Sequence, residues 1–357
     1  MKTNCFILCA ALCGVLTVSA QTPKAILPLF PPVLSTIPAN GDLNPYGLAV
    51  VPRTLLGTTV LQPGDMLVSN FNNSDNLQGT GTTIVRIDQQ GNLSLFYQGQ
   101  GLGFTGALGV LSDGIVVAGS LPTTDGTPAT IQSGSLLFID PRGNLLATMN
   151  QSGLINGPWG LAIHDFGGGA AQIFVSNVLS GQIMRFDVTY DGGGQTVAVQ
   201  RAVTVASGFS HRTDPGAIVL GPSGLAYDAQ HDILYIASSA DNAIYAMNGA
   251  AGANGPHGTG STIFNDATKL HGPVNLVLAP NGHLIVANSD GSNQDLTQTS
   301  ELVEITTGGQ FIAEYSIDRG SGAAFGIAVT TIAPGTVRVA AVDDSTNTLK
   351  TFVTLIE

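Results

Sequence analysis

The stretch that decides the fold is Gly157-Pro158-Trp159-Gly160-Leu161-Ala162-Ile163, because similar stretches recur along the whole chain. It places a small residue, a proline, one variable residue and a glycine directly before alternating apolar residues. This arrangement is typical of a tight turn into a buried strand, and its recurrence indicates a repeat architecture. The other copies are Asn44–Val50, Gly106–Val110, Gly221–Tyr227, Gly272–Val277 and Ala324–Val329.

A second apolar strand follows every copy and ends in small or amide residues, as in Ile173-Phe174-Val175-Ser176-Asn177. A third strand that ends on a polar residue and a fourth strand after a glycine turn complete most units. The marker glycine falls at positions 47, 109, 160, 224 and 326, with Asn275 in its place in the fifth copy. Short antiparallel strands repeated radially predict an all-β, six-bladed β-propeller with four strands per blade. We expect the blades near residues 44–100, 101–150, 155–206, 215–265, 270–316 and 322–355.

The last blade needs a strand from the other end of the chain. The sixth copy runs out at its third strand, Thr348–Leu355, while an apolar segment, Lys24–Phe30, precedes the first full repeat. We predict that residues 24–30 supply the missing outer strand and close the ring. Pro28 suits an outer edge, where its missing N–H faces away from the ladder.

Residues 1–20 have the features of a secretory signal peptide. Lys2 precedes the apolar run Cys5–Val18, and Val18-Ser19-Ala20 is a small-x-small cleavage site. The run is shorter than the roughly 20 residues of a spanning helix; a retained anchor is the alternative. We expect residues 21–357 to form one secreted or periplasmic domain without membrane insertion. All three cysteines lie in this segment, so the mature chain would have neither disulfides nor thiolate ligands.

The charge balance narrows the choice of partner. The formal net charge is −12, and only 10% of residues are charged. Nucleic acids and anionic lipids require a basic face, so this composition argues against both. We expect a monomer whose partner is an unknown small molecule, glycan or protein.

The Pro-x-Gly-Leu/Ile-Ala pieces and the strands ending in Ser/Ala-Asn resemble NHL-type repeats and the regucalcin–gluconolactonase propellers. The resemblance covers about residues 44 to 355 and implies the fold. In the lactonases it also implies a divalent metal, held by an Asn or Asp at the variable position of Pro-x-Gly and by a Glu of the first blade. No Glu occurs between Gln21 and Gln100, and no variable position carries a carboxylate or amide. We therefore predict no metal site, no cofactor and no catalytic residue of the lactonase type, and we lean against an enzyme.

The variable positions themselves are the first candidate binding site, at the mouth of the central tunnel. They are Tyr46, Leu108, Trp159, Ser223, Val274 and Phe325. Aromatic rings in a concave mouth suit apolar or sugar-ring ligands; the alternative is that they plug the tunnel. Weaker candidates at the rim are Asn70, Asn177, Asn288 and His271.

Three long polar loops between second and third strands, Phe71–Gly81, Ser120–Ser133 and Ser289–Ser300, should surround the same mouth. Such loops carry recognition in many folds, or are merely tolerated insertions. The stretch His211–Asp214 between blades three and four is interpreted as a solvated connection. Together these features predict an exported binding or scaffold propeller that recognises a small molecule, glycan or protein segment on its looped face. The alternative is a lactonase-like hydrolase or a lyase with a non-standard active site.

Overall fold

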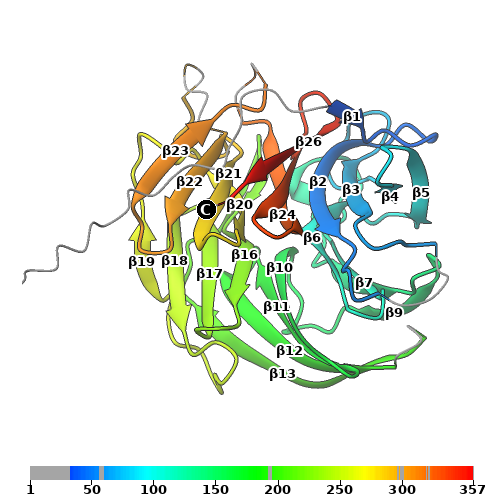
Figure 1. The fold of residues 1–357 in the computed structure, drawn as a ribbon, viewed down its shortest axis with the longest axis horizontal. Coiled ribbons are helices and arrows are strands. Elements are labelled where there is room, and N and C mark those ends of the chain that lie inside the picture. The colour runs from blue at the N-terminus through cyan, green and yellow to red at the C-terminus, as the bar shows by residue number, and fades with distance from the viewer. Residues whose placement is uncertain are drawn as a thin grey trace, which may run out of the picture.

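The protein is a six-bladed β-propeller in a computed structural model, as the repeats predict (Figure 1). The structure describes residues 33–55, 60–191, 195–295, 297, 301–318, 320 and 322–356. The predicted signal peptide therefore lies outside the described residues. Each blade is a four-stranded antiparallel sheet, and β2, β6, β10, β16, β20 and β24 surround the centre.

The strands of the first three blades follow one another without a crossover. They are β2 (Leu43–Val50), β3 (Met66–Asn72), β4 (Thr83–Ile87) and β5 (Leu93–Gln98); β6 (Phe104–Val110), β7 (Val116–Ser120), β8 (Ser135–Ile139) and β9 (Leu145–Met149); and β10 (Pro158–Gly167), β11 (Ala170–Asn177), β12 (Gln182–Tyr190) and β13 (Val197–Ser207).

The other three blades repeat the order, except that the last one takes its outer strand from the N-terminal side. They are β16 (Pro222–Asp228), β17 (Ile233–Ser238), β18 (Ala243–Asn248) and β19 (Ser261–Phe264); β20 (Pro273–Leu278), β21 (His283–Asn288), β22 (Leu302–Thr306) and β23 (Phe311–Tyr315); and β24 (Ala324–Ala333), β25 (Thr336–Asp343), β26 (Thr348–Leu355) and β1 (Val33–Ser35).

The closing strand of the ring is β1. Val33 pairs with Lys350 and Ser35 with Thr348, antiparallel to β26. Thr36 then donates from its Oγ1 to the Asn347 carbonyl at 2.9 Å. Closure by an N-terminal strand is thus confirmed, with the strand at Val33–Ser35. The segment predicted for this role, residues 24–30, lies outside the described residues.

Close approach of neighbouring blades explains the marker glycine. A Cβ added to Gly160 would lie 2.2 Å from the carbonyl oxygen of Ser223 in the next blade, and one on Gly224 would lie 2.4 Å from the Asn275 Cα. Real Cβ atoms do not approach backbone so closely. At these positions the innermost strands of neighbouring blades come so close that only a glycine fits.

Blade two departs from the sequence-based alignment. Phe104 pairs with Ser120 and Leu108 with Ala118, whereas in blade one Pro45 pairs with Asn70 and Leu48 with Val68. This register makes Ala107, not Gly109, the equivalent of the marker glycine. An irregularity between Phe104 and Leu108 adds one residue here, which misaligned the motif by two positions.

Hydrophobic clusters fill the layers between successive blades. Phe104, Leu108 and Leu137 pack with Leu67 and Phe96 between blades one and two, and comparable clusters lie between later blades. A further cluster joins blades five, six and one and continues to the tunnel mouth. Alternating inward and outward residues along each strand produce these layers.

No helix among the described residues is long and apolar enough to cross a bilayer.

Candidate functional site

Aromatic side chains from three blades meet at the tunnel mouth. Tyr46 stacks on Phe325 with ring centroids 4.0 Å apart, and on Phe71 at 4.7 Å. Trp159 approaches Tyr46 edge-on at 5.7 Å and Phe71 at 5.6 Å. Tyr46, Trp159 and Phe325 are all buried. These rings largely close the tunnel, as the plug alternative expects, and Tyr46 has both faces covered.

The other predicted members of the ring lie in different surroundings. Val274 lies at the mouth beside the aromatic rings. Ser223 is 1% exposed and donates to the Gly221 carbonyl at 2.9 Å, so its hydroxyl is already occupied. Leu108 is not at the mouth: it packs between blades one and two, because the shifted register puts Gly106 in the ring position. A Cβ on Gly106 would point to within 3.1 Å of the Trp159 carbonyl.

A β-hairpin covers the mouth, where the sequence suggested a solvated connection. It consists of β14 (Arg212–Asp214) and β15 (Ile218–Leu220) between blades three and four. Asp214 is partly buried and accepts the N–H groups of Gly216 and Ala217 at 2.9 Å, which shapes the turn. Arg212 and Thr213 are exposed as predicted, but β15 is buried.

Ile218 in this hairpin has a left-handed backbone, with φ of 61°, and is fully buried. A β-branched residue is strained in this conformation, at a cost of about 1–3 kcal/mol. Its side chain belongs to the same hydrophobic cluster as Tyr46 and Trp159. Burial of the side chain compensates for the backbone strain and holds the hairpin down over the mouth.

The loop of blade one contacts the hairpin. Gln78 donates from its Nε2 to the Gly216 carbonyl at 3.0 Å. The loop of blade two supports this contact, because Thr123 donates to the Gln78 carbonyl. In blade five, Gly291 lies against the hairpin: a Cβ there would be 2.8 Å from Leu220. The three predicted loops thus gather around the mouth, in the parts that the structure describes.

A cavity of about 170 Å³ remains beneath this cover. Its apolar lining comes from Tyr46, Trp159 and Phe325, from Val274 and from β15. Its polar lining consists of Asn44, Gln78, Ser239, Ser289 and Asp344. The Asn44 side chain donates to the Tyr46 hydroxyl at 3.3 Å.

A second ring of equivalent positions explains this mixed lining. In each blade it is the residue directly after the one that pairs with the Pro-x-Gly proline or with its equivalent. In blades one to three these residues are Phe71, Leu121 and Val178, and in blades four to six they are Ser239, Ser289 and Asp344. The first three are buried in the mouth cluster, whereas the last three line the cavity. The mouth therefore has an apolar half and a polar half.

Asp344 is the charged group of the cavity. Burial raises the pKa of its carboxyl well above the usual value, and the negative charges of Asp343, Asp318 and Glu301 raise it further. A hydrogen bond from the Ser345 backbone opposes the shift. Burial and Asp344 also raise the pKa of the Tyr46 hydroxyl, which therefore stays protonated. A carboxyl with a raised pKa in a cavity is a recognised feature of functional sites.

The predicted rim asparagines anchor loops. Asn177 accepts from the Asn156 N–H at 2.9 Å and donates to the Leu154 carbonyl at 2.9 Å. Asn288 makes the same pair of bonds, to His271 and Lys269. Asn70 donates to the Thr36 carbonyl, and all three amides are almost fully buried. Each holds the incoming connection of its own blade, so none of them faces the cavity.

His271 also lies away from the cavity. It is 3% exposed, and its Nδ1 contacts the Asn293 carbonyl at 2.7 Å. Its Nε2 is buried without a hydrogen-bond partner among the described residues. Across those same residues there is no group of three or more His, Cys, Asp or Glu side chains that could hold a metal ion.

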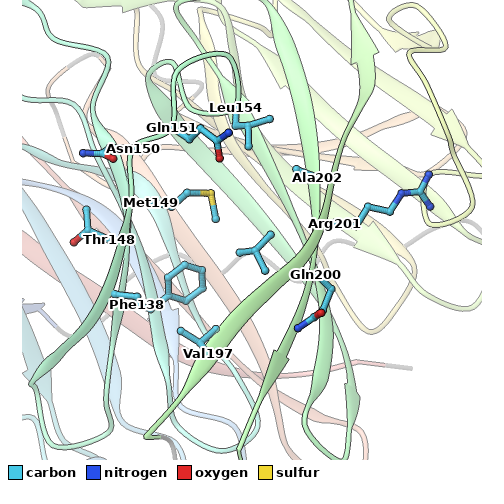
Figure 2. A pocket seen from close by; sticks show the side chains of 12 residues that line it. Phe138, Thr148, Met149, Asn150, Gln151, Leu154, Val197, Gln200, Arg201 and Ala202 are labelled. Atoms are coloured by element: carbon cyan, nitrogen blue, oxygen red, sulfur yellow. The ribbon is translucent and has the colours of Figure 1, made fainter.

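A second cavity, of about 490 Å³, lies on the outer rim between β9 and β13 (Figure 2). Phe138, Met149 and Val197 point into it, whereas Arg201 extends away and donates to Asn254 at 2.8 Å. Arg201 is the ionisable side chain among the described residues that line this cavity.

Sequence reasoning found the mouth and missed most of its polar residues. Asp344, Ser239 and Ser289 each follow the second-strand motif directly, so the repeat carried the signal. The hairpin has no such signal, because its φ-positive Ile218 contradicts ordinary turn preferences.

Comparisons with known proteins support the fold. No family model matches the sequence, and no curated protein matches it. Among solved structures, the chain is similar to a gluconolactonase from Xanthomonas campestris, with 12% identity over 95% of this chain and 99% of that one and a TM-score of 0.53. It is also similar to a catalytically inactive virginiamycin B lyase from Staphylococcus aureus, whose structure was solved with quinupristin. The identity is 16% over 91% of this chain and 99% of that one, and the TM-score is 0.51. It is also similar to a luciferin-regenerating enzyme, with 10% identity over 92% of this chain and 96% of that one and a TM-score of 0.50.

These likenesses confirm the predicted resemblance at the level of the fold. Lactonase and lyase enzymes both occur among the neighbours. Because one fold carries many activities, the function has to be argued from the site of this chain.

Proposed function

We propose that this protein binds a small molecule in the capped cavity at its tunnel mouth. The observation that carries the proposal is the lining of that cavity: aromatic and aliphatic side chains on one side, and Asn44, Ser239, Ser289 and Asp344 on the other. Pockets for small ligands combine a mostly apolar wall with a few oriented polar groups in this way.

The volume limits the ligand. A cavity of about 170 Å³ holds roughly five or six waters' share of liquid volume. Ligand pockets for drug-sized molecules are larger, about 300–1,000 Å³. The cavity therefore suits a small molecule, or one end of a longer one, better than a folded protein segment or an extended glycan.

We also propose that binding takes place outside the cytoplasm, in the periplasm or the medium. The support is the sequence from Met1 to Ala20, with Lys2, the apolar run to Val18 and the Ser19-Ala20 cleavage site. A propeller without cysteines after Ala20 has no need of an oxidising compartment and would tolerate either location.

A second candidate is acid–base catalysis of a lyase or hydrolase type. The specific observation is Asp344, a cavity-lining carboxyl whose pKa burial raises, as is common for catalytic acids and bases. The protonated Tyr46 hydroxyl lies close enough for its pKa to respond to Asp344. Turnover of a ligand that is lost in Asp344→Asn, with binding retained, would favour catalysis over binding alone.

The test of binding uses Trp159, the only tryptophan in the chain and part of the cavity wall. Native mass spectrometry of the purified protein identifies a co-purifying compound. Titration of the protein with this compound should change the Trp159 emission. Trp159→Ala should weaken binding by about 2 kcal/mol, as for an aromatic anchor. Trp159→Phe, which keeps an aromatic ring, is the control for packing.

Unchanged affinity of the folded fraction of Trp159→Ala would contradict a site at the mouth. A compound that binds with full affinity but leaves the emission of Trp159 unaltered would place the site elsewhere.

A further inference from the structure

Negative charge is concentrated behind the cavity. Asp343, Asp318 and Glu301 raise the pKa of Asp344, and Asp318 raises that of Glu301, at the end of blades five and six. Among the described residues, Lys350 is a nearby cation, and its Nζ is 2.6 Å from Asp343 Oδ2. The same ammonium donates to the Ile317 carbonyl, so it is committed to the blade and does not balance Asp344.

Glu301 shows that this charge is incompletely compensated. One oxygen accepts the Ile317 N–H at 2.6 Å, but Oε1 is buried without a partner among the described residues. Burial and the charge of Asp318 raise the pKa of Glu301 to about 8. Buried carboxylates normally have a cation or several donors, and among the described residues the N–H groups of Ile317 and Asp318 both bond the same oxygen of Glu301.

Aromatic surface faces the same cavity. Tyr46 is stacked on both faces, so the rings left to contact a ligand are those of Phe325 and Trp159. An aromatic face beside a carboxylate attracts a cation through both the ring quadrupole and the charge.

We propose that the mouth cavity selects a small organic ammonium ion, with its nitrogen at Asp344 and its carbon skeleton against Phe325, Trp159 and Val274. This inference rests on the proposed function, because it names the class of ligand for that same site. A bound ammonium would supply the positive charge that Lys350 cannot, and it would stabilise the ionised form of Asp344.

Other charges fit less well. An anion would face Asp344 across an apolar wall, and no basic side chain occurs among the described residues that line the cavity. A divalent metal requires several oxygen ligands, and among the described residues no acidic or histidine cluster provides them.

The experiment compares three probes of one shape: benzylammonium, benzyl alcohol and benzoate. Each is titrated at pH 8 against Trp159 emission and the thermal midpoint. We expect benzylammonium to bind at least tenfold more tightly than benzyl alcohol, and benzoate to bind more weakly than either. Asp344→Asn should remove the tenfold preference and leave benzyl alcohol unaffected. Asp75→Asn, an exposed carboxyl in the loop of blade one, should keep it.

The outcomes separate the two proposals. Binding of benzyl alcohol or benzoate without a tenfold advantage for benzylammonium would overturn the ammonium inference and leave the proposed function standing. Calcium that binds at the mouth and displaces benzylammonium would overturn it in favour of a metal. Failure of all three probes to change either readout would count against both. If Asp344→Asn does not fold, lowering the pH to protonate Asp344 should weaken benzylammonium binding to the unaltered protein and not that of benzyl alcohol; equal effects of pH on the two probes would overturn the inference.

Discussion

The two halves of the tunnel mouth use equivalent positions for opposite purposes. Phe71 in blade one and Ser289 in blade five each come directly after the residue that pairs with the Pro-x-Gly proline, yet the first is buried in an aromatic cluster and the second lines a cavity. A radial repeat can therefore assign stability and binding to different blades without altering its backbone.

Contacts between blades follow the same division. Ser69 donates to the Thr105 carbonyl, Thr105 to the Pro158 carbonyl, and Ser176 to the Ser223 carbonyl, which links blades one to four in series. In blades four to six the positions equivalent to Ser69 are occupied by Ala237, Ala287 and Val342, which lack a hydroxyl. The half whose blades are hydrogen-bonded in series therefore carries the apolar members of the second ring, and the other half carries its polar members.

The largest expected effect is at the junction of the two halves. Gly160→Ala should destabilise the protein by at least about 3 kcal/mol, because the new Cβ would overlap the Ser223 carbonyl at 2.2 Å. Gly255→Ala is the control, since nothing lies within 4 Å of a Cβ there. Urea unfolding of both variants measures the difference. Similar stabilities would mean that blades three and four are not in close contact.

Truncation of the two equivalent residues, Phe71 and Ser289, tests the difference between the halves. Phe71→Ala should cost about 3–5 kcal/mol, because it leaves a hole in a stacked cluster. Ser289→Ala should cost only about 1 kcal/mol, from the hydrogen bond to the Gly272 carbonyl. Equal losses in chemical denaturation would refute the division into a structural and a binding half.

Buried carboxyl groups in both halves should make stability depend on pH. Folding raises the pKa of Glu301 to about 8, and burial raises that of Asp113 to about 6. Between pH 4.5 and 8 the folded state thus binds more protons than the unfolded one, and stability falls as pH rises. We expect a loss of about 1–3 kcal/mol from pH 5.5 to 8.

Asp344→Asn should reduce this loss, because its carboxyl has a raised pKa as well. Thermal melts of both proteins across this range test the sign. At lower pH the trend reverses, since hydrogen bonds from Thr130 and Thr127 lower the pKa of Asp125 and similar turn carboxylates lose these bonds on protonation. Stability that rises steadily from pH 5.5 to 8 would contradict the assigned shifts.

The smallest effect concerns the contact that spans the halves. Gln78→Met removes the hydrogen bond to Gly216 on the hairpin and keeps the length of the side chain. It should cost about 0.5–1.5 kcal/mol or less. The same change should increase quenching of Trp159 by acrylamide, because the cover over the cavity loosens. Unchanged quenching would mean that burial of Ile218 alone holds the hairpin in place.

Features that recur in the blades could be predicted from the sequence, whereas features that occur only once could not. The Pro-x-Gly glycines recur because each blade meets the next at the tunnel, so the number of blades and the ring positions followed from them. Leu108 was misplaced because one added residue in blade two disturbs the register without changing the residue types. The hairpin over the mouth depends on a single strained Ile218 and on contacts with a loop 138 residues away, which no local pattern contains.

The pairing of β1 with β26 has a kinetic consequence. Val33 and Lys350 are partners across almost the whole described chain, so the ring closes only after every other blade has been formed or brought into place. Contacts between such distant residues form slowly, because the loop entropy is lost before the contact is gained. Until then the outer edge of β26 is open to pairing with another chain. Folding of this propeller is therefore most vulnerable to aggregation in its final step, when five complete blades await a strand of three residues.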